Sequence, residues 1–162
     1  LNIIPCCKNS KIPYGKEWTT RSPEKSLYII KNNPELNIGI LLGKIIDVEA
    51  DSEKANKLLC RIIGDYPHPC YSSRKSLHHL FKTPDIHLTR FVFDNIEFRG
   101  KNHFSILPPS IVKGVPYKWI SYTEKIPEMP KSLLKYYWKT KRFVEETKKK
   151  KRSNSYSFFQ FA

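Results

Sequence analysis

The sequence has no long hydrophobic run. None of its apolar stretches approaches the roughly 18 residues that a membrane-spanning helix needs, so we expect no transmembrane segment and no membrane partner. The chain begins with Leu1 and shows no basic segment followed by an apolar one. We therefore expect a fragment of a longer intracellular protein, without a signal peptide, rather than a secretory precursor.

Cysteine is scarce, with four residues in 162 at irregular spacing. This excludes a disulfide scaffold, and no Cys-x-x-Cys pair indicates zinc. Cys60, His68 and Cys70 could still meet around a metal ion, although zinc ligands usually occur as closely spaced pairs. The alternative, which we favour, is buried and reduced thiols.

Acidic residues are few: 15 Asp and Glu stand against 29 Lys and Arg, for a net charge of +14. With 40% hydrophobic residues the chain can still bury a core, which excludes general disorder. The positive excess indicates a polyanionic partner, either nucleic acid or nucleotide. The basic residues expected to contact nucleic acid lie near the C-terminus and are Lys139, Lys141, Arg142, Lys148, Lys149, Lys150, Lys151 and Arg152. The alternative for this run is a solvated tail.

Capping residues and apolar spacing predict three helices. Ser22 followed by Pro23 predicts the start of the first helix. Apolar residues recur at helical spacing over residues 52–63, with Asp51 as the expected N-cap, and again over residues 130–146.

Short apolar runs separated by turn residues predict strands. Two of them, residues 38–42 and 45–49, are separated by Gly43 and Lys44, which predicts a β-hairpin. Further strands are expected at residues 70–72, 77–81, 89–93, 95–98 and 104–107. Together with the helices they predict an α+β domain with a mixed or antiparallel sheet.

Two carboxylates interrupt an apolar strand. Asp47 and Glu49 are two residues apart, and alternate side chains of a strand face the same way, so both project from one face. Unpaired charges in such a run are unfavourable, and oxygen ligands of this kind suit Mg²⁺ or Mn²⁺ with substrate phosphates. The alternative is the exposed face of an edge strand.

Two further segments carry residues suited to phosphate chemistry. In one, Ser76 and His78 alternate in a predicted strand beside Arg74 and Lys75, and in the other Glu97 lies within an apolar run. Cationic side chains bind phosphoryl oxygens while carboxylates hold the cation, so the combination indicates metal-dependent phosphoryl chemistry. A histidine taken alone would more often be structural.

A series of short motifs runs along the chain. They are Lys11-x-Pro13 with Trp18, Asn37-Ile38-Gly39-Ile40 with Gly43, Ile45-Ile46-Asp47-Val48-Glu49, Ser76-x-His78-x-x-Phe81, Glu97-x-Arg99-Gly100, and Leu107-Pro108-Pro109-Ser110 with Gly114, Tyr117 and Trp119. Their order and spacing resemble the N-terminal domain of bifunctional DNA primase-polymerases, members of the archaeo-eukaryotic primase superfamily that are common in plasmids, phages and mobile elements.

The resemblance implies two packed α/β units, one of them an RRM-like catalytic sheet flanked by helices, with the active site between them. It also implies two Mg²⁺ or Mn²⁺ ions held by Asp47, Glu49 and Glu97. Because the family usually has Asp at the third position, Asp94 is the alternative to Glu97. The groups implied to hold the nucleotide phosphates are Ser76, His78, Arg74, Lys75 and Arg99.

The implied activity is a DNA primase or DNA polymerase that replicates a plasmid, phage or other mobile or organellar element. Its partners would be single-stranded or primed DNA, nucleoside triphosphates and a helicase module or protein. We expect the catalytic core over residues 1–125, a helix packed on or beside it over residues 126–147, and a flexible basic tail over residues 148–162. The alternatives are a metal-dependent nuclease and a catalytically degenerate nucleic-acid-binding domain.

Overall fold

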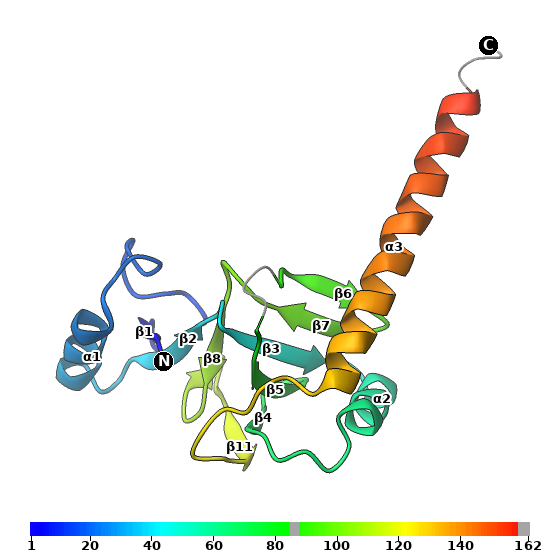
Figure 1. Cartoon of the computed structure of the whole chain (residues 1–162). Coiled ribbons are helices and arrows are strands. Elements are labelled where there is room, and N and C mark those ends of the chain that lie inside the picture. Colours follow the sequence, from blue (N-terminus) through cyan, green and yellow to red (C-terminus); the bar gives the residue numbers. More distant parts are fainter. Residues whose placement is uncertain (85–87, 159–162) are drawn as a thin grey trace. The chain divides into compact units, whose positions relative to one another are not determined.

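The computed structural model of the chain describes residues 1–84 and 88–158, which form two units, Leu1–Met129 and Pro130–Ala162 (Figure 1). The last four residues of the expected basic tail lie outside the described residues. The helices are α1 (Pro23–Asn32), α2 (Glu53–Ile63) and α3 (Lys131–Phe158). The strands are β1 (Ile3–Cys6), β2 (Asn37–Leu41), β3 (Ile45–Ala50), β4 (Cys70–Ser72), β5 (Leu77–Lys82), β6 (Phe91–Phe93), β7 (Ile96–Arg99), β8 (Phe104–Leu107), β9 (Ile111–Val112), β10 (Val115–Pro116) and β11 (Lys118–Ser121).

Helices α1 and α2 begin at serine caps. The hydroxyl of Ser22 accepts a hydrogen bond from the backbone N–H of Lys25, as its position before Pro23 predicts. For α2 the expected cap, Asp51, is wrong: the hydroxyl of Ser52 accepts the N–H of Ala55 at 3.1 Å. Aspartate and serine are both good N-caps, so the choice between Asp51 and Ser52 depends on the residue at which the first helical turn begins.

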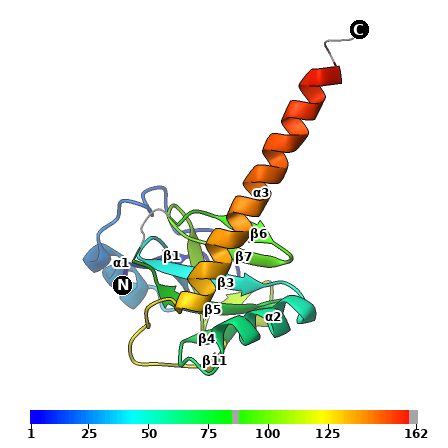
Figure 2. The same cartoon turned by 45° about the vertical axis from the view of Figure 1, so that its right-hand side comes forward.

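The strands of the first unit form antiparallel sheets, and the prediction of an α+β fold is confirmed. The larger sheet has the order β11-β4-β5-β3-β7-β6, the smaller one the order β1-β2-β8, and β9 and β10 form a short hairpin. Helix α2 lies along the larger sheet in both ribbon views, next to β3 and β7 (Figures 1 and 2). Strand β3 is therefore a central strand, not the edge strand considered from the sequence.

The predicted hairpin of β2 and β3 is wrong, because the two strands belong to different sheets. β2 pairs with β1 and β8, whereas β3 pairs with β5 and β7. The connection is held at each end by a different neighbour: the N–H of Leu42 donates to the carbonyl of His103, and the carbonyl of Lys44 accepts from Thr83. Each strand thus has both edges occupied by partners in its own sheet, which leaves no edge for pairing between β2 and β3.

The apolar core between the two sheets determines which face of β3 points inward. The smaller sheet contributes Ile4, Ile40 and Ile106, and the larger sheet contributes Tyr71 and Leu80. Leu80 is the register partner of Asp47, so this carboxylate faces the same interface between the sheets. The acidic face of β3 therefore points toward the smaller sheet.

The opposite face of the larger sheet is apolar and covered by α2. Val48 and Phe98 are register partners on β3 and β7, and both are fully buried. Leu59 of α2 is also fully buried, and α2 contacts both strands. The alternation along β3 thus separates a hydrophobic face from a charged one, as its sequence predicts.

The second unit contains α3, which is longer than expected. The sequence predicted a helix to residue 146, but α3 continues to Phe158 through the lysine-rich segment. No glycine or proline interrupts residues 131–158, and lysine is a good helix former, so nothing local ends the helix earlier. Within it, the Lys141 ammonium lies 5.4 Å from the ring centroids of Tyr137 and Trp138. Despite its length, neither α3 nor any other described helix is apolar enough to span a membrane.

Candidate active site

The charged face of β3 gathers the predicted catalytic residues. Asp47 and Glu49 point from this face, and register partners in an antiparallel sheet share a face. On β5, His78 is opposite Glu49, and on β7, Glu97 is opposite Glu49 and Arg99 is opposite Asp47. Two neighbouring strands therefore bring a histidine, an arginine and a third carboxylate to the Asp-x-Glu pair.

Asp47 is completely buried and held through one of its two oxygens. Its Oδ2 accepts from His78 Nδ1 at 2.9 Å and from the hydroxyl of Ser105, which comes from β8 of the other sheet. Burial raises the pKa of Asp47, but the charge and hydrogen bond of His78, the Ser105 hydroxyl and Arg99 together hold it below its usual value. Asp47 is thus ionised, and its Oδ1 has no hydrogen-bond partner within the described residues.

Glu49 lies beside Asp47 with partners on each oxygen. Its Oε1 accepts from the Ser76 hydroxyl and lies 3.6 Å from His78 Nε2, while Oε2 is in ion-pair contact with Arg99 Nη2, without hydrogen-bond geometry. Burial, together with the neighbouring charge of Asp47, raises the pKa of Glu49 above its usual value, although His78, Ser76 and Arg99 lower it. The two carboxylates of the pair are therefore shifted in opposite directions, Asp47 downward and Glu49 upward.

Glu97 is enclosed by arginines. Arg90 Nε donates to its Oε1 at 2.6 Å, and Arg99 Nη2 lies 3.2 Å from its Oε2. Burial raises the pKa of Glu97, but the two arginines outweigh this and lower it. The alternative carboxylate, Asp94, lies in the exposed turn between β6 and β7 with φ +49°. Of the two, Glu97 is the one on the shared face.

His78 lies between the two carboxylates of β3. Its ring stacks in parallel on Tyr71 with centroids 4.6 Å apart, and only 2% of the residue is exposed. Burial lowers the pKa of His78, but Asp47 and Glu49 raise it above its usual value. With Nδ1 donating to Asp47, the Nε2 atom is directed toward the Glu49 side of the site.

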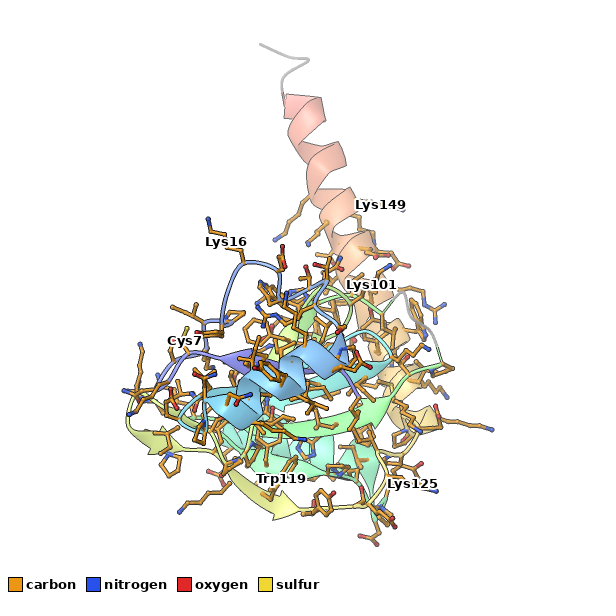
Figure 3. The ribbon with its side chains drawn as sticks, turned by 90° about the vertical axis from the view of Figure 1, so that its left-hand side faces the viewer. Cys7, Lys16, Lys101, Trp119, Lys125 and Lys149 are labelled. Atoms are coloured by element: carbon orange, nitrogen blue, oxygen red, sulfur yellow. The ribbon has the colours of Figure 1, made fainter. Side chains whose placement is uncertain are left out.

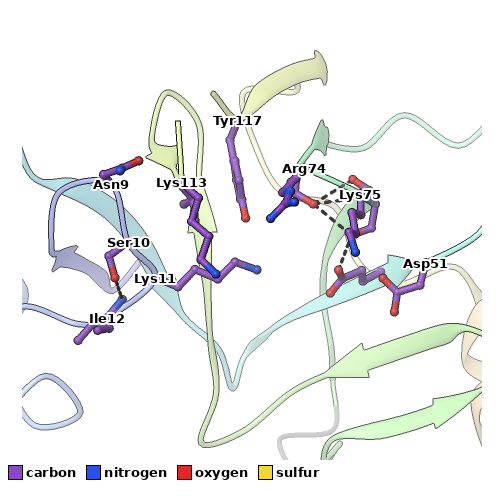
Figure 4. A pocket seen from close by; sticks show the side chains of 13 residues that line it. Asn9, Ser10, Lys11, Ile12, Asp51, Arg74, Lys75, Lys113 and Tyr117 are labelled. Atoms are coloured by element: carbon purple, nitrogen blue, oxygen red, sulfur yellow. Dashed lines mark hydrogen bonds between the residues drawn. The ribbon is translucent and has the colours of Figure 1, made fainter. Parts of the chain in front are cut away.

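Two cavities open onto this face. The first, of about 520 Å³, includes Glu49, Ser76, Arg74 and Lys75 in its wall (Figure 4). The second, of about 450 Å³, includes His78, Glu97, Arg99 and Arg90. Tyr117 and Lys11 line both. The residues predicted from the sequence to hold phosphates are therefore divided between two adjoining spaces, and Ser76 and His78 do not open into the same one.

The donor set fits a divalent cation at Asp47 and Glu49. Within residues 1–84 and 88–158, no three His, Cys, Asp or Glu side chains form a ready-made metal site. Mg²⁺, however, is commonly held by one or two carboxylates with waters and substrate phosphates. The buried Oδ1 of Asp47, without a hydrogen-bond partner in this described part, and the neighbouring Glu49 provide such a pair. Glu97 could join them only by leaving its arginines.

The remaining predicted residues lie elsewhere. The lysines and arginines assigned to nucleic acid belong to α3 in the second unit, and the side chain of Arg152 is outside the described part of the chain. The cysteines form no disulfide, and His68 Nε2 lies 2.8 Å from His79 Nδ1 on the face opposite the carboxylates. Among the described residues, Cys60, His68 and Cys70 thus form no cluster that could hold a zinc ion.

Several site residues had no assigned role in the sequence analysis. Ser105 has a weak signal, a polar residue inside the apolar run of β8. Arg90, Tyr71 and Lys113 have none, because only the tertiary structure brings them to the carboxylates or the cavities. Lys11 belongs to the first of the motifs that carry the family resemblance, but the sequence analysis assigned it no function.

A comparison with protein families agrees with this geometry. The family model described as "bifunctional DNA primase/polymerase, N-terminal" matches residues 1–132. The match covers the whole of the first unit, and with it the Asp-x-Glu strand, both cavities and the turn that carries Lys113. No curated protein sequence matches the chain.

Proposed function

Because the chain belongs to the family of the N-terminal domains of bifunctional DNA primase/polymerases, we propose that it joins nucleotides on a DNA template with Mg²⁺ or Mn²⁺. Nucleotidyl transfer of the primase or polymerase type, with DNA and nucleotides as substrates, is the general activity of this family, which is metal-dependent. The observation that carries the proposal is the convergence of Asp47, Glu49 and Glu97 with His78 on one sheet face beside a basic cavity.

In this proposal Asp47 and Glu49 hold the cation. The low pKa of Asp47 keeps this carboxylate charged at neutral pH, and the His78 and Ser105 hydrogen bonds fix its orientation with Oδ1 free. When bound, such a cation lowers the pKa of an attacking 3′-hydroxyl and stabilises the charge that develops on the α-phosphate and pyrophosphate. A second cation would use Glu97 after Arg99 and Arg90 turn toward phosphate.

The triphosphate lies in the first cavity in this proposal. Ser76 lies at its edge beside Glu49, and Arg74 and Lys75 occupy the turn between β4 and β5. Cationic groups there neutralise phosphoryl oxygens next to the metal ligands, as transfer of a nucleotidyl group requires. His78, whose pKa Asp47 and Glu49 raise, lies on the other side of Glu49 and would stabilise the Asp47 carboxylate and the developing negative charge.

The DNA contacts proposed for α3 are electrostatic. Its lysines and arginines would follow the phosphate backbone without reading sequence, and binding would weaken as salt rises. The resemblance to proteins common in plasmids, phages and mobile elements supports replication of such an element as the setting. Cooperation with a helicase is a proposal that rests on the same resemblance.

Primer extension tests the function. A labelled primer-template is incubated with deoxynucleotides or ribonucleotides and either Mg²⁺ or Mn²⁺, and we expect the primer to lengthen. Asp47→Asn and Glu49→Gln should each reduce the rate at least about a hundredfold, equal to about 2.7 kcal/mol of transition-state stabilisation, with DNA affinity unchanged. Glu53→Gln, at the exposed start of α2, is the matched control and should retain activity.

The other outcomes identify the alternatives. A primer that shortens in a manner dependent on Asp47 would show that the same carboxylates activate water, as in a nuclease. A protein that binds DNA tightly but neither lengthens nor shortens it with any nucleotide would be a degenerate binding domain, and the proposed activity would be wrong.

A further inference from the structure

The first cavity has two basic walls that come from different parts of the chain. One wall is the turn between β4 and β5, with Arg74 and Lys75. The other wall consists of Lys11, from the loop after β1, and Lys113, from the turn between β9 and β10. Figure 4 shows the Lys11 side chain extending toward the side of Arg74 and Lys75, the Lys113 side chain running down toward Lys11, and Tyr117 between the two walls. We call Lys11 and Lys113 the lysine wall.

The two segments of the lysine wall are tied together by a buried asparagine. Asn37 is 5% exposed, and its amide nitrogen donates to the carbonyls of Ser10 at 2.9 Å and of Ile111 at 2.6 Å. Its amide oxygen accepts the N–H of Ile111 at 3.0 Å. One side chain therefore fixes the residue before Lys11 and the strand that leads to Lys113.

A second asparagine joins the same segments directly. The backbone carbonyl of Asn9 accepts the N–H of Lys113 at 3.1 Å, and its side-chain oxygen accepts the N–H of Gly114 at 2.7 Å. Asn9 and Lys113 both have positive φ, at 54° and 50°. Such conformations are uncommon for residues other than glycine and persist where surrounding contacts determine them, so this arrangement of the two turns is a specific one.

The cations of the cavity are not neutralised by the protein. Within the described ranges, none of Lys11, Arg74, Lys75 and Lys113 has an ion-pair partner, and all four are exposed to solvent. The cavity also includes Glu49, the proposed cation ligand, at the same wall as Ser76. Four free positive charges beside a metal-binding carboxylate are complementary to a polyphosphate that carries a divalent cation. The volume of about 520 Å³ is in the usual range of small-molecule sites.

We propose that the lysine wall binds the β- and γ-phosphates of the incoming nucleoside triphosphate from the side opposite Arg74 and Lys75. This inference rests on the proposed function and adds to it two residues outside the carboxylate sheet that bind the terminal phosphates. The triphosphate then bridges the two sheets, since Lys11 follows β1 of the smaller sheet and Arg74 precedes β5 of the larger one. Nucleoside monophosphates, which lack these phosphates, are bound without the lysine wall.

Charge-removing variants test the inference. Lys11→Gln, Lys113→Gln and the double variant change exposed side chains and leave the fold intact. We expect the KM for the nucleotide to rise about fivefold to twentyfold in each single variant and about a hundredfold in the double variant, with kcat and DNA affinity changed less than about twofold. Lys16→Gln is the matched control, because Lys16 lies on the same N-terminal loop with an exposed side chain (Figure 3) but does not line the cavity.

Direct binding separates this inference from the proposed function. Inorganic triphosphate and a nucleoside monophosphate are titrated against the wild type, the double variant and Lys16→Gln with Mg²⁺ present, without DNA. Weaker triphosphate binding by the double variant alone, with unchanged monophosphate binding, supports the lysine wall even if no primer is extended. The lysine wall would be wrong if the double variant and the wild type had equal triphosphate affinity or equal KM. It would also be wrong if the wild type bound no triphosphate. Neither result would affect the primer-extension test of the proposed function.

Discussion

Ser105 connects the two sheets at the proposed cation site, and its removal is the most direct test of how that site is held. Ser105 is 2% exposed, and its hydroxyl donates to Oδ2 of Asp47, across a separation of 58 residues in the chain. Ser105→Ala leaves this oxygen with His78 alone. The carboxylate then loses one of the two hydrogen bonds that hold Oδ2 and leave Oδ1 without a partner in the described structure.

The expected effect follows from the burial and charge of the pair. A hydrogen bond to a charged group contributes about 1.5–3 kcal/mol, and Asp47 is fully buried, so water cannot replace the lost donor. We expect the free energy of unfolding to fall by about 2 kcal/mol. Because this hydrogen bond also lowers the pKa of Asp47, its loss raises that pKa. Loss of a group that orients a metal ligand typically weakens metal affinity about tenfold to a hundredfold.

Two measurements check this expectation. Binding of Mn²⁺ is followed by electron paramagnetic resonance of the free ion, and stability is followed by urea unfolding. Ser26→Ala is the matched control, since Ser26 is fully buried in α1 and its hydroxyl has no hydrogen-bond partner in the described structure. If Ser105→Ala and Ser26→Ala had the same Mn²⁺ affinity and the same urea midpoint, the role assigned to Ser105 would be wrong.

Two further substitutions test the sheet that carries the site. Burial and the neighbouring His68 lower the pKa of His79 from 6.5 to about 4, so the unfolded chain binds this proton first and stability falls as the pH drops from about 6.5 to about 4, by up to about 3 kcal/mol. The difference between urea unfolding at pH 7.5 and at pH 4.5 should therefore be smaller in His79→Gln, and an equal difference would contradict the assignment. At Gly100 an added Cβ would lie 1.9 Å from the backbone oxygen of Leu88, so Gly100→Ala should lower stability by about 1–3 kcal/mol in thermal unfolding; an unchanged melting temperature would show that this loop yields without strain.

Short-range patterns predicted much of the fold. Helix α1 begins after Ser22 as expected, and the strands at residues 70–72 and 104–107 have the expected bounds. The alternation of Asp47 and Glu49 correctly placed both on one face of β3. These features depend on residues within a few positions of one another, and the sequence displays that information directly.

The errors lie where a second sheet competes. The apolar runs of β2 and β3 fit a hairpin locally, yet each has two other neighbours. Strand β1 and the β9–β10 hairpin were not expected at all, because Pro5 lies in β1 and Pro116 in β10, and proline is a signal against a strand. Their pairing partners stabilise them, and these partners are distant in the chain.

What the sequence by itself determined is the set of chemical groups and their local faces: three carboxylates, a histidine and an excess of cations on strands of known alternation. Tertiary structure alone decided which of them meet. It joined Ser105 to Asp47, enclosed Glu97 between two arginines, and brought Lys11 and Lys113 to one cavity. The physical reason is that antiparallel pairing and core packing act between residues far apart in the chain. Several pairings fit the local sequence equally well, and burial of the apolar core of the whole domain selects one of them.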